Sequence, residues 1–182
     1  MRDTVDPQVE RALGELVAQL RLEGGRMVAL TGAGISVASG IPPFRGRAGL
    51  WARYDPEEFA HIDAFRRNPA KVWGMMAELA EVLAKAQPNP AHRALAQLER
   101  RGVLGAVITQ NIDGLHQRAG NRQVVELHGN FRRAVCLDCG VVRPTLAVAE
   151  RVRQGEADAG RCPCGGWLKP DIVFFGEPLS ER

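Results

Sequence analysis

Residues 27–46 read MVALTGAGISVASGIPPFRG, a short apolar run followed at once by a glycine-rich loop. A continuous apolar run of this kind predicts a strand buried on both faces of a parallel sheet. Gly32 and Gly34 lack a Cβ, so backbone N–H groups after the strand could bind a phosphate, and the Ser36 hydroxyl could add a contact. Val37 stands where the dinucleotide fingerprint has its third glycine, so a tight structural turn fits the pattern equally well.

The residues after the loop indicate that it does not run into a long helix. Ser39–Pro43 reads SGIPP, and proline lacks an N–H group and restricts the residue before it. We therefore expect the chain to leave the loop after about one helical turn. Phe44 and Arg45 follow, an apolar ring that could cover a nicotinamide and a cation that could meet phosphate oxygens. The alternative is a surface loop with one buried phenylalanine.

Helices and apolar runs alternate along most of the chain. Helices are predicted to begin at Asp6–Pro7, Asn68–Pro69 and Asn89–Pro90, because a capping side chain before proline suits a first turn. The first of these has apolar residues at helical spacing from Val9 to Leu20, and buried strands are predicted over 105–109 and 124–127. This alternation predicts an α/β fold, a Rossmann-like parallel sheet with helices on both faces.

The alternation breaks where the four cysteines lie and resumes with the run DIVFF at 171–175. We therefore expect three parts. Residues 1–130 form a Rossmann-like domain with a glycine loop and a helical insertion, 131–168 a small cysteine-bearing module, and 169–182 a return to the first domain.

Composition excludes several classes of protein. The formal charge is +3 and the basic residues are scattered among acidic ones, so no nucleic-acid-binding patch is expected. No apolar segment is long enough to span a bilayer, and the first ten residues carry charges where a secretory signal would be apolar. A cytoplasmic location is expected. Only three of the 24 basic residues are lysines, which favours a GC-rich bacterial source.

The cysteines form two close pairs, Cys136 with Cys139 and Cys162 with Cys164, separated by 22 residues. In a reducing cytosol two chelating pairs predict a tetrahedral tetrathiolate zinc site rather than disulfides. Four thiolates leave no open position for water, so the metal would be structural. The C-x-C spacing of the second pair is tight, and four unligated thiols are the alternative.

Polar side chains follow the two later strands. Gln110, Asn111 and Asp113 come after 105–109, and His128 comes after 124–127. Ligands of open α/β sheets bind outside the carboxyl ends of strands, and an imidazole can accept a proton near neutral pH. A lone histidine is more often structural, and Asn111 or Asp113 could equally cap a helix.

The other three histidines are not assigned to the site. His116 is expected to be buried and structural, His92 to belong to a helix opening and His61 to a loop.

Four motifs, in order, resemble those of the sirtuins, the NAD-dependent protein lysine deacylases. They are GAGIS at 32–36 with SGIP at 39–42 and Phe44–Arg45, TQNIDGLH at 109–116, ELHG at 126–129, and VFFGE at 173–177 after Lys169–Asp171. The cysteine segment lies between the third and fourth motifs, as in that family.

The resemblance implies removal of acetyl or other acyl groups from protein lysine, giving nicotinamide, O-acetyl-ADP-ribose and free lysine. It implies NAD and zinc as cofactors and His128 as the base that deprotonates a ribose hydroxyl, with Asn111 as a second catalytic residue. It implies that NAD contacts Gly32, Ala33, Gly34, Ser36, Ile41, Phe44, Arg45, Gln110, Asn111, Ile112 and Asp113, that an acetylated peptide pairs with Val173, Phe174, Phe175, Gly176 and Glu177, and that zinc is held by the four cysteines.

Two departures from the sirtuin pattern leave alternatives open. Pro43 replaces a residue that is often Asp or Thr, and the family's later Gly-Thr-Ser segment is not found, which suggests a partial chain. A zinc-ribbon interaction module without catalysis and a mono-ADP-ribosyltransferase are therefore the alternatives. A dehydrogenase is disfavoured because no convincing acidic residue after a second strand would hold the adenosine ribose, and no catalytic dyad for hydride transfer is found. Some sirtuins bind acidic acyl groups through a Tyr-x-x-Arg pair. The only tyrosine here, Tyr54, has Glu57 three positions on, so the resemblance implies acetyl or longer apolar acyl groups.

Overall fold

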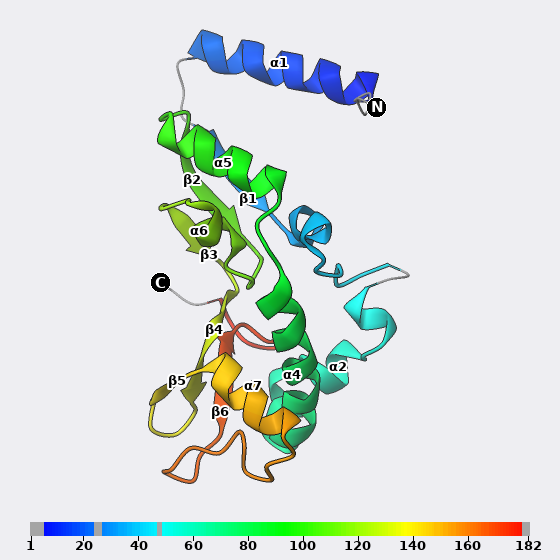
Figure 1. The fold of residues 1–182 in the computed structure, drawn as a ribbon, viewed down its shortest axis with the longest axis vertical. Coiled ribbons are helices and arrows are strands. Elements are labelled where there is room, and N and C mark those ends of the chain that lie inside the picture. Colours follow the sequence, from blue (N-terminus) through cyan, green and yellow to red (C-terminus); the bar gives the residue numbers. More distant parts are fainter. Residues whose placement is uncertain (1–5, 24–26, 47–48, 180–182) are drawn as a thin grey trace.

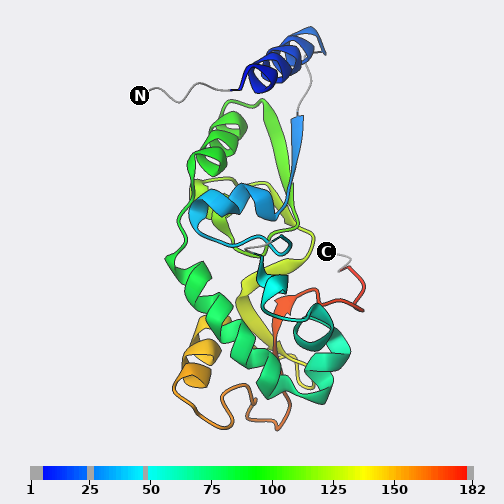
Figure 2. The same ribbon diagram turned by 90° about the vertical axis from the view of Figure 1, so that its right-hand side faces the viewer.

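The computed structural model describes residues 6–23, 27–46 and 49–179. Its elements divide into two parts that lie one above the other along the long axis of the molecule (Figures 1 and 2). In chain order they are α1 (Pro7–Glu23), β1 (Met27–Thr31), the 3-10 helices η1 (Ala33–Ser39) and η2 (Leu50–Ala52), α2 (Pro56–Phe59), α3 (Ile62–Arg67), α4 (Pro69–Lys85), α5 (Pro90–Arg100), β2 (Leu104–Thr109), α6 (Leu115–Ala119), β3 (Val124–Glu126), β4 (Gly129–Cys136), β5 (Val142–Pro144), α7 (Thr145–Arg153) and β6 (Leu168–Ile172).

The upper part contains a parallel sheet in the order β1-β2-β3. Thr31 pairs with Thr109, and Thr109 with Glu126, so the three strands end at the same edge. Helices α5 and α6 contact each other, and α5 packs on β2 (Figure 1). The predicted α/β fold with a parallel sheet is therefore confirmed, and the glycine loop and residues 110–113 emerge side by side from neighbouring strands.

The prediction that residues 27–30 are buried on both faces is wrong for the described chain. Val28, Leu30 and Val125 point to the same face of the sheet and are 58%, 68% and 46% exposed. Alternate residues of a strand face opposite sides, and α5 covers the side to which Val107 points, where it is fully buried. Among the described residues, no helix packs on the face of Val28 and Leu30 as α5 packs on the opposite face.

Helix α1 begins as predicted, with the Asp6 carboxylate accepting a hydrogen bond from the backbone N–H of Gln8 at 2.8 Å. Its apolar residues Val9, Leu13 and Leu16 are nevertheless exposed. Figure 1 shows why, because the helix lies apart from the rest of the chain at the top of the molecule. Leu20 lies outside the residues whose side chains are described.

The lower part contains a second sheet, in the order β5-β4-β6, with antiparallel pairing throughout. The sequence pattern predicts that residues 169–182 return to the first domain, a boundary that stays a prediction, but the strand at the start of this segment does not join the parallel sheet. β6 ends at Ile172 and pairs with β4 instead, with Gly129 opposite Ile172. Gly129 has a φ of +73°, and a Cβ built there would lie 2.1 Å from the carbonyl oxygen of Asp171, so the close approach of these strands requires glycine.

The main apolar core lies in the lower part. It joins α3 and α4 to β4, β6 and α7. Trp73 is its largest buried side chain, and its indole N–H donates to the carbonyl of Leu168 at 2.8 Å. Asn68 caps α4 by accepting from the backbone N–H of Lys71, so the predicted start of that helix is confirmed. Helices α3 and α4, which lie between β1 and β2 in sequence, therefore pack with the cysteine-bearing part.

Gly129→Ala tests the strand crossing, with Gly102→Ala as its matched control. Both glycines have a positive φ, +73° and +75°, but a Cβ at Gly102 meets nothing within 4 Å. We expect Gly102→Ala to cost about 1–2 kcal/mol, the cost of a left-handed alanine. Gly129→Ala should cost clearly more in urea unfolding, because the added carbon also collides with Asp171. Equal costs would show that the contact between β4 and β6 relaxes freely.

Candidate active site and metal centre

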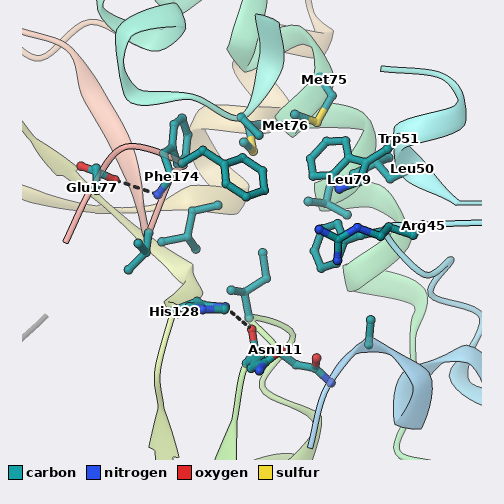
Figure 3. A pocket seen from close by; sticks show the side chains of 18 of the residues that line it. Arg45, Leu50, Trp51, Met75, Met76, Leu79, Asn111, His128, Phe174 and Glu177 are labelled. Carbon is teal, nitrogen blue, oxygen red and sulfur yellow. Dashed lines mark hydrogen bonds between the residues drawn. The ribbon is translucent and has the colours of Figure 1, made fainter. Parts of the chain in front are cut away.

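A cavity of about 660 Å³ opens where the two parts meet, and it is lined by segments that are far apart in sequence (Figure 3). The loop after β1 contributes Ala33, Pro43, Phe44 and Arg45, the end of β2 contributes Gln110, Asn111 and Ile112, and the later segments contribute His128 and residues 172–177. The structure thus brings together most of the predicted cofactor, catalytic and substrate residues around one space.

His128 stands at the floor of this cavity, next to Asn111 (Figure 3). Its Nδ1 lies 3.0 Å from the backbone carbonyl oxygen of Gln110. A carbonyl can only accept, so Nδ1 carries the proton of the neutral ring and Nε2 is left with a free lone pair. The tautomer that this contact selects is the one in which Nε2 can act as a base.

Asn111 holds the glycine loop against the end of β2. Its side-chain N–H₂ group donates to the carbonyl of Gly32 at 3.0 Å and to the Ser36 hydroxyl at 3.2 Å. Ser36 in turn donates to the Asp113 carboxylate at 2.7 Å. Asn111 and Ser36 are buried, and of these three polar side chains Asn111 lines the cavity while Ser36 and Asp113 lie behind it. Asp113 also accepts from the backbone N–H of Leu115, although Gly114 and not Asp113 occupies the N-cap position of α6.

The glycine loop does not run into a long helix, as the prolines predict, but η1 spans seven residues, roughly two 3-10 turns rather than the one expected. η1 ends at Gly40, whose φ of +84° turns the chain away from the helix axis. Phe44 then reaches the cavity and stacks on Trp51, with ring centroids 5.4 Å apart. Gly34 and Ile41 do not line the cavity, and Ile41 packs against the lower core instead.

An apolar wall closes the cavity opposite His128. It consists of Leu50, Trp51, Met75, Met76 and Leu79, from η2 and one face of α4 (Figure 3). None of these five residues was among the predicted site residues. Trp51 was missed because an isolated aromatic residue in a loop carries no periodic signal, whereas GLW directly after a cofactor loop is a cue that could have found it.

Residues 173–177 form a tight turn rather than a free strand edge. Phe175 exchanges backbone hydrogen bonds with Ala60 and Ile62, Val173 donates to the carbonyl of His128, and Glu177 donates to Phe174. Within 173–177, the Gly176 N–H is the backbone donor with no acceptor in the described chain.

The turn is fixed by a largely buried ion pair. Lys169 Nζ lies 2.9 Å from Glu177 Oε2 and donates to the carbonyl of Ile172 at 2.7 Å. The same Glu177 oxygen accepts from the backbone N–H of Phe174, and the Lys169 ammonium lies 4.5 Å from the centre of the Phe174 ring. A charged group this far from water is stable when both partners are hydrogen-bonded, as here.

The four cysteines converge at the far end of the lower part. Their sulfur atoms lie within 4.8 Å of one another, with Cys136 and Cys162 buried and Cys139 and Cys164 exposed. The backbone N–H of Cys139 is the main influence that lowers the pKa of the Cys136 thiol to about 7. A compact set of four sulfurs, one of them readily deprotonated, fits a structural zinc ion. The geometry contains no open ligand position, and the short C-x-C pair does not prevent the convergence.

Two histidines lie buried behind the site. His116 occupies α6 and His92 the first turn of α5, as expected, and both are at most 1% exposed. Burial is the main cause that lowers the pKa of each ring, and the Asp113 carboxylate acts weakly in the opposite direction. Both rings are therefore neutral in the folded protein near pH 7.

Known proteins share the sequence motifs that form this cavity. The Sir2 family model matches residues 32–182. The chain belongs to the Sir2 family. Proteins described as NAD-dependent protein deacetylases from Pyrobaculum aerophilum and Sulfolobus acidocaldarius are each 52% identical to it, over 91% and 90% of this chain. The chain spans 64% of the length of each of these relatives. These relatives are archaeal, and the bacterial source stays a prediction.

Solved structures of this family share the fold. One, described as a Sir2 homolog–NAD complex, has a TM-score of 0.74 at 49% identity and covers 84% of this chain and 58% of that chain. Another, from work on the structural basis of sirtuin substrate affinity, has a TM-score of 0.80 at 41% identity, with 92% and 67% covered. None of the described helices of this Sir2 protein is both long and apolar enough to cross a bilayer.

Removal of zinc tests the cysteine cluster. We expect a strong chelator, or Cys164→Ser, to lower the free energy of unfolding by on the order of 5 kcal/mol or more, because metal binding is coupled to folding of such modules. Native mass spectrometry should show one zinc lost, and hydrogen exchange should accelerate in β4, β5 and α7. Amides of β1 and β2 serve as the internal control, and a chelated protein with unchanged exchange near the cysteines would contradict a structural metal.

The buried histidines predict a pH dependence of stability. They are neutral in the folded protein, whereas the unfolded chain takes up protons near pH 6.5, so acidification favours unfolding. Their contribution is complete above that pH and is lost as the pH falls below it, at up to about 1.4 kcal/mol per pH unit for each histidine. Urea unfolding between about pH 7 and pH 5.5 should show this slope, and His116→Phe should make it shallower. An unchanged slope would mean that His116 is protonated in the folded state.

Proposed function

We propose that this chain carries the catalytic site of an NAD-dependent protein-lysine deacylase, which yields nicotinamide, O-acetyl-ADP-ribose and free lysine. The observation that carries the proposal is the free Nε2 of His128 in a cavity formed jointly by the glycine loop, the end of β2 and residues 172–177. The family membership and the names of the relatives support it. A cytoplasmic location is part of the same proposal.

The residues present fit NAD. The loop from Gly32 to Ser36 offers backbone N–H groups, and a Cβ at Gly34 would meet nothing within 4 Å, so a phosphate has room to approach. Phe44 and Arg45 reach the cavity from the same loop and would cover the nicotinamide and meet phosphate oxygens. Bound there, NAD supplies a labile glycosidic bond to the chemistry.

The protein's own share is orientation and proton transfer. His128 Nε2 would accept a proton from a ribose hydroxyl, and the hydrogen bond of Nδ1–H to Gln110 would stabilise the imidazolium that results. Asn111, fixed by Gly32 and Ser36, would hold a ribose hydroxyl or a water with its remaining oxygen. Stacked aromatic rings and the apolar wall would exclude bulk water from the reacting atoms.

The peptide would enter along residues 173–177. Because most N–H groups of this turn already donate within the chain, an added strand would rely on the Gly176 N–H and on carbonyl oxygens there. Such pairing reads the backbone of the substrate and gives little sequence selectivity. The wall formed by Met75, Met76 and Leu79 contains no cation, which favours acetyl or longer apolar acyl groups over acidic ones.

Mass spectrometry of an acetyl-lysine peptide with NAD tests the proposal. We expect deacetylated peptide, nicotinamide and O-acetyl-ADP-ribose in equal amounts, and a loss of at least about 100-fold in His128→Ala, because a general base contributes that much. His128→Ala should keep its zinc and its circular dichroism, since His128 lies outside the core. Turnover unchanged in that variant would reject the mechanism.

Two other outcomes would support the alternatives. A peptide that gains the mass of ADP-ribose would indicate mono-ADP-ribosyl transfer, and no reaction by a folded, zinc-loaded protein would indicate an interaction module.

A further inference from the structure

Two buried ring nitrogens near the active site have no hydrogen-bond partner in the described chain. They are Nε2 of His92 and Nδ1 of His116. The two rings face each other, with centroids 4.9 Å apart and planes inclined by 57°. A buried polar atom without a partner costs about 1–3 kcal/mol, so two such atoms on adjacent rings require an explanation.

The other nitrogen of each ring fixes its tautomer. His92 Nδ1 accepts the backbone N–H of Asn89 in the capping box of α5, so the proton of a neutral ring lies on Nε2. His116 Nε2 lies 2.9 Å from the Thr31 hydroxyl, and that hydroxyl donates to the Thr109 hydroxyl. His116 Nε2 must therefore be the donor to Thr31, which leaves Nδ1 of His116 as a bare acceptor.

The two unpartnered atoms are thus complementary, a donor on His92 and an acceptor on His116. We propose that His92 and His116 form a neutral N–H···N pair, direct or through one buried water, and that this pair positions Asn111 and the glycine loop. The centroid distance of 4.9 Å is close to the separation of two imidazole rings that share an N–H···N bond.

The pair completes a closed circuit of hydrogen bonds beneath the cavity. On one side, Asn89 donates through Nδ2 to the carbonyl of Ile35 and to the Ser39 hydroxyl, both on the glycine loop. On the other side, Thr109 accepts the backbone N–H of Asn111. The side chain of Asn111 then donates to Gly32 and Ser36 of the glycine loop. His92 and His116 join the Asn89 side of this network to the Thr109 side.

A connected network of this kind stabilises the site more than the same hydrogen bonds would separately, because it fixes elements that otherwise meet only at their ends. α5, α6, β1, β2 and η1 each contribute one or more members. Preorganised contacts raise affinity and rate by reducing the ordering that a ligand would otherwise impose. His92 and His116 would act through Asn111 and the loop, and are therefore positioning residues.

The charged groups around the pair are compatible with neutral rings. The Asp113 carboxylate is the nearby anion and favours a proton on either ring, while Arg93 disfavours one on His92. Asp113 is occupied by the Ser36 hydroxyl and by the backbone N–H of Leu115. Desolvation outweighs its pull, and both rings keep one proton each.

Nitrogen NMR of the full chain tests the pair directly. With ¹⁵N-labelled histidine, we expect His92 and His116 to show the Nε2–H tautomer and to keep it as the pH falls through 6.5, the ordinary value for histidine. The Nε2 proton of His92 should exchange slowly with solvent and shift in a His116→Phe variant. A direct bond gives a nitrogen–nitrogen coupling, and a water-bridged one does not. An Nδ1–H tautomer on either ring, or protonation of either ring near pH 6.5, would overturn the proposal.

Thr31→Val tests the positioning role, with Thr145→Val as its matched control. Both changes replace a threonine hydroxyl by a methyl, but the buried hydroxyl of Thr145 has no partner in the described chain. Thr31→Val should speed exchange of the Asn111 amide and raise the dissociation constant of ADP-ribose roughly two- to ten-fold, the worth of one hydrogen bond. Thr145→Val should change neither.

The ADP-ribose measurement alone rests on the proposed function. A chain that fails to bind ADP-ribose would count against that function. The histidine tautomers and the exchange rate of the Asn111 amide would still test the proposed pair of His92 and His116. Equal effects of the two valine variants on Asn111 exchange would overturn the positioning role.

Discussion

The hydrogen bonds of Asn111 to the glycine loop are the contact on which the site depends. The Gly32 carbonyl and the Ser36 hydroxyl belong to the turn after β1, and Asn111 follows β2. Parallel pairing that ends with Thr31 opposite Thr109 brings the two segments to the same edge. Without a donor at position 111, the Gly32 carbonyl would keep only its hydrogen bond from the backbone N–H of Ile35, and the loop would lose its side-chain link to the end of β2. The register of β1 and β2 therefore sets where the glycine loop lies in the candidate site, and the side-chain amide of Asn111 holds it there.

Local signals in the sequence predicted most of this region. Prolines at 42 and 43 forced an early exit from η1, and capping asparagines at 68 and 89 marked the starts of α4 and α5. The four cysteine sulfurs converge as their spacing suggested. Each of these features is set by residues close in sequence, where the physical rule needs no knowledge of the remaining fold. The roles of individual site residues and the domain boundaries stay predictions.

Long-range features were not predictable in the same way. An apolar strand such as residues 27–30 reads as doubly buried, yet whether both faces are covered depends on which elements reach them. The run at 171–175 has strand character, but its partner was decided by the close approach of Gly129 to Asp171 in β6. Trp51 and Met75 line the cavity only because η2 and α4 meet there. The pairing of His92 with His116 likewise emerges from the packing of α5 on α6.

The backbone of His128 belongs to both halves of the molecule. Its carbonyl accepts the N–H of Val173, and its imidazole is held by Gln110 from the parallel sheet, while the next residue opens β4 of the cysteine-bearing sheet. The position of this imidazole therefore depends on both halves at once. A change in how either half packs would be felt at His128 through a single backbone or side-chain contact.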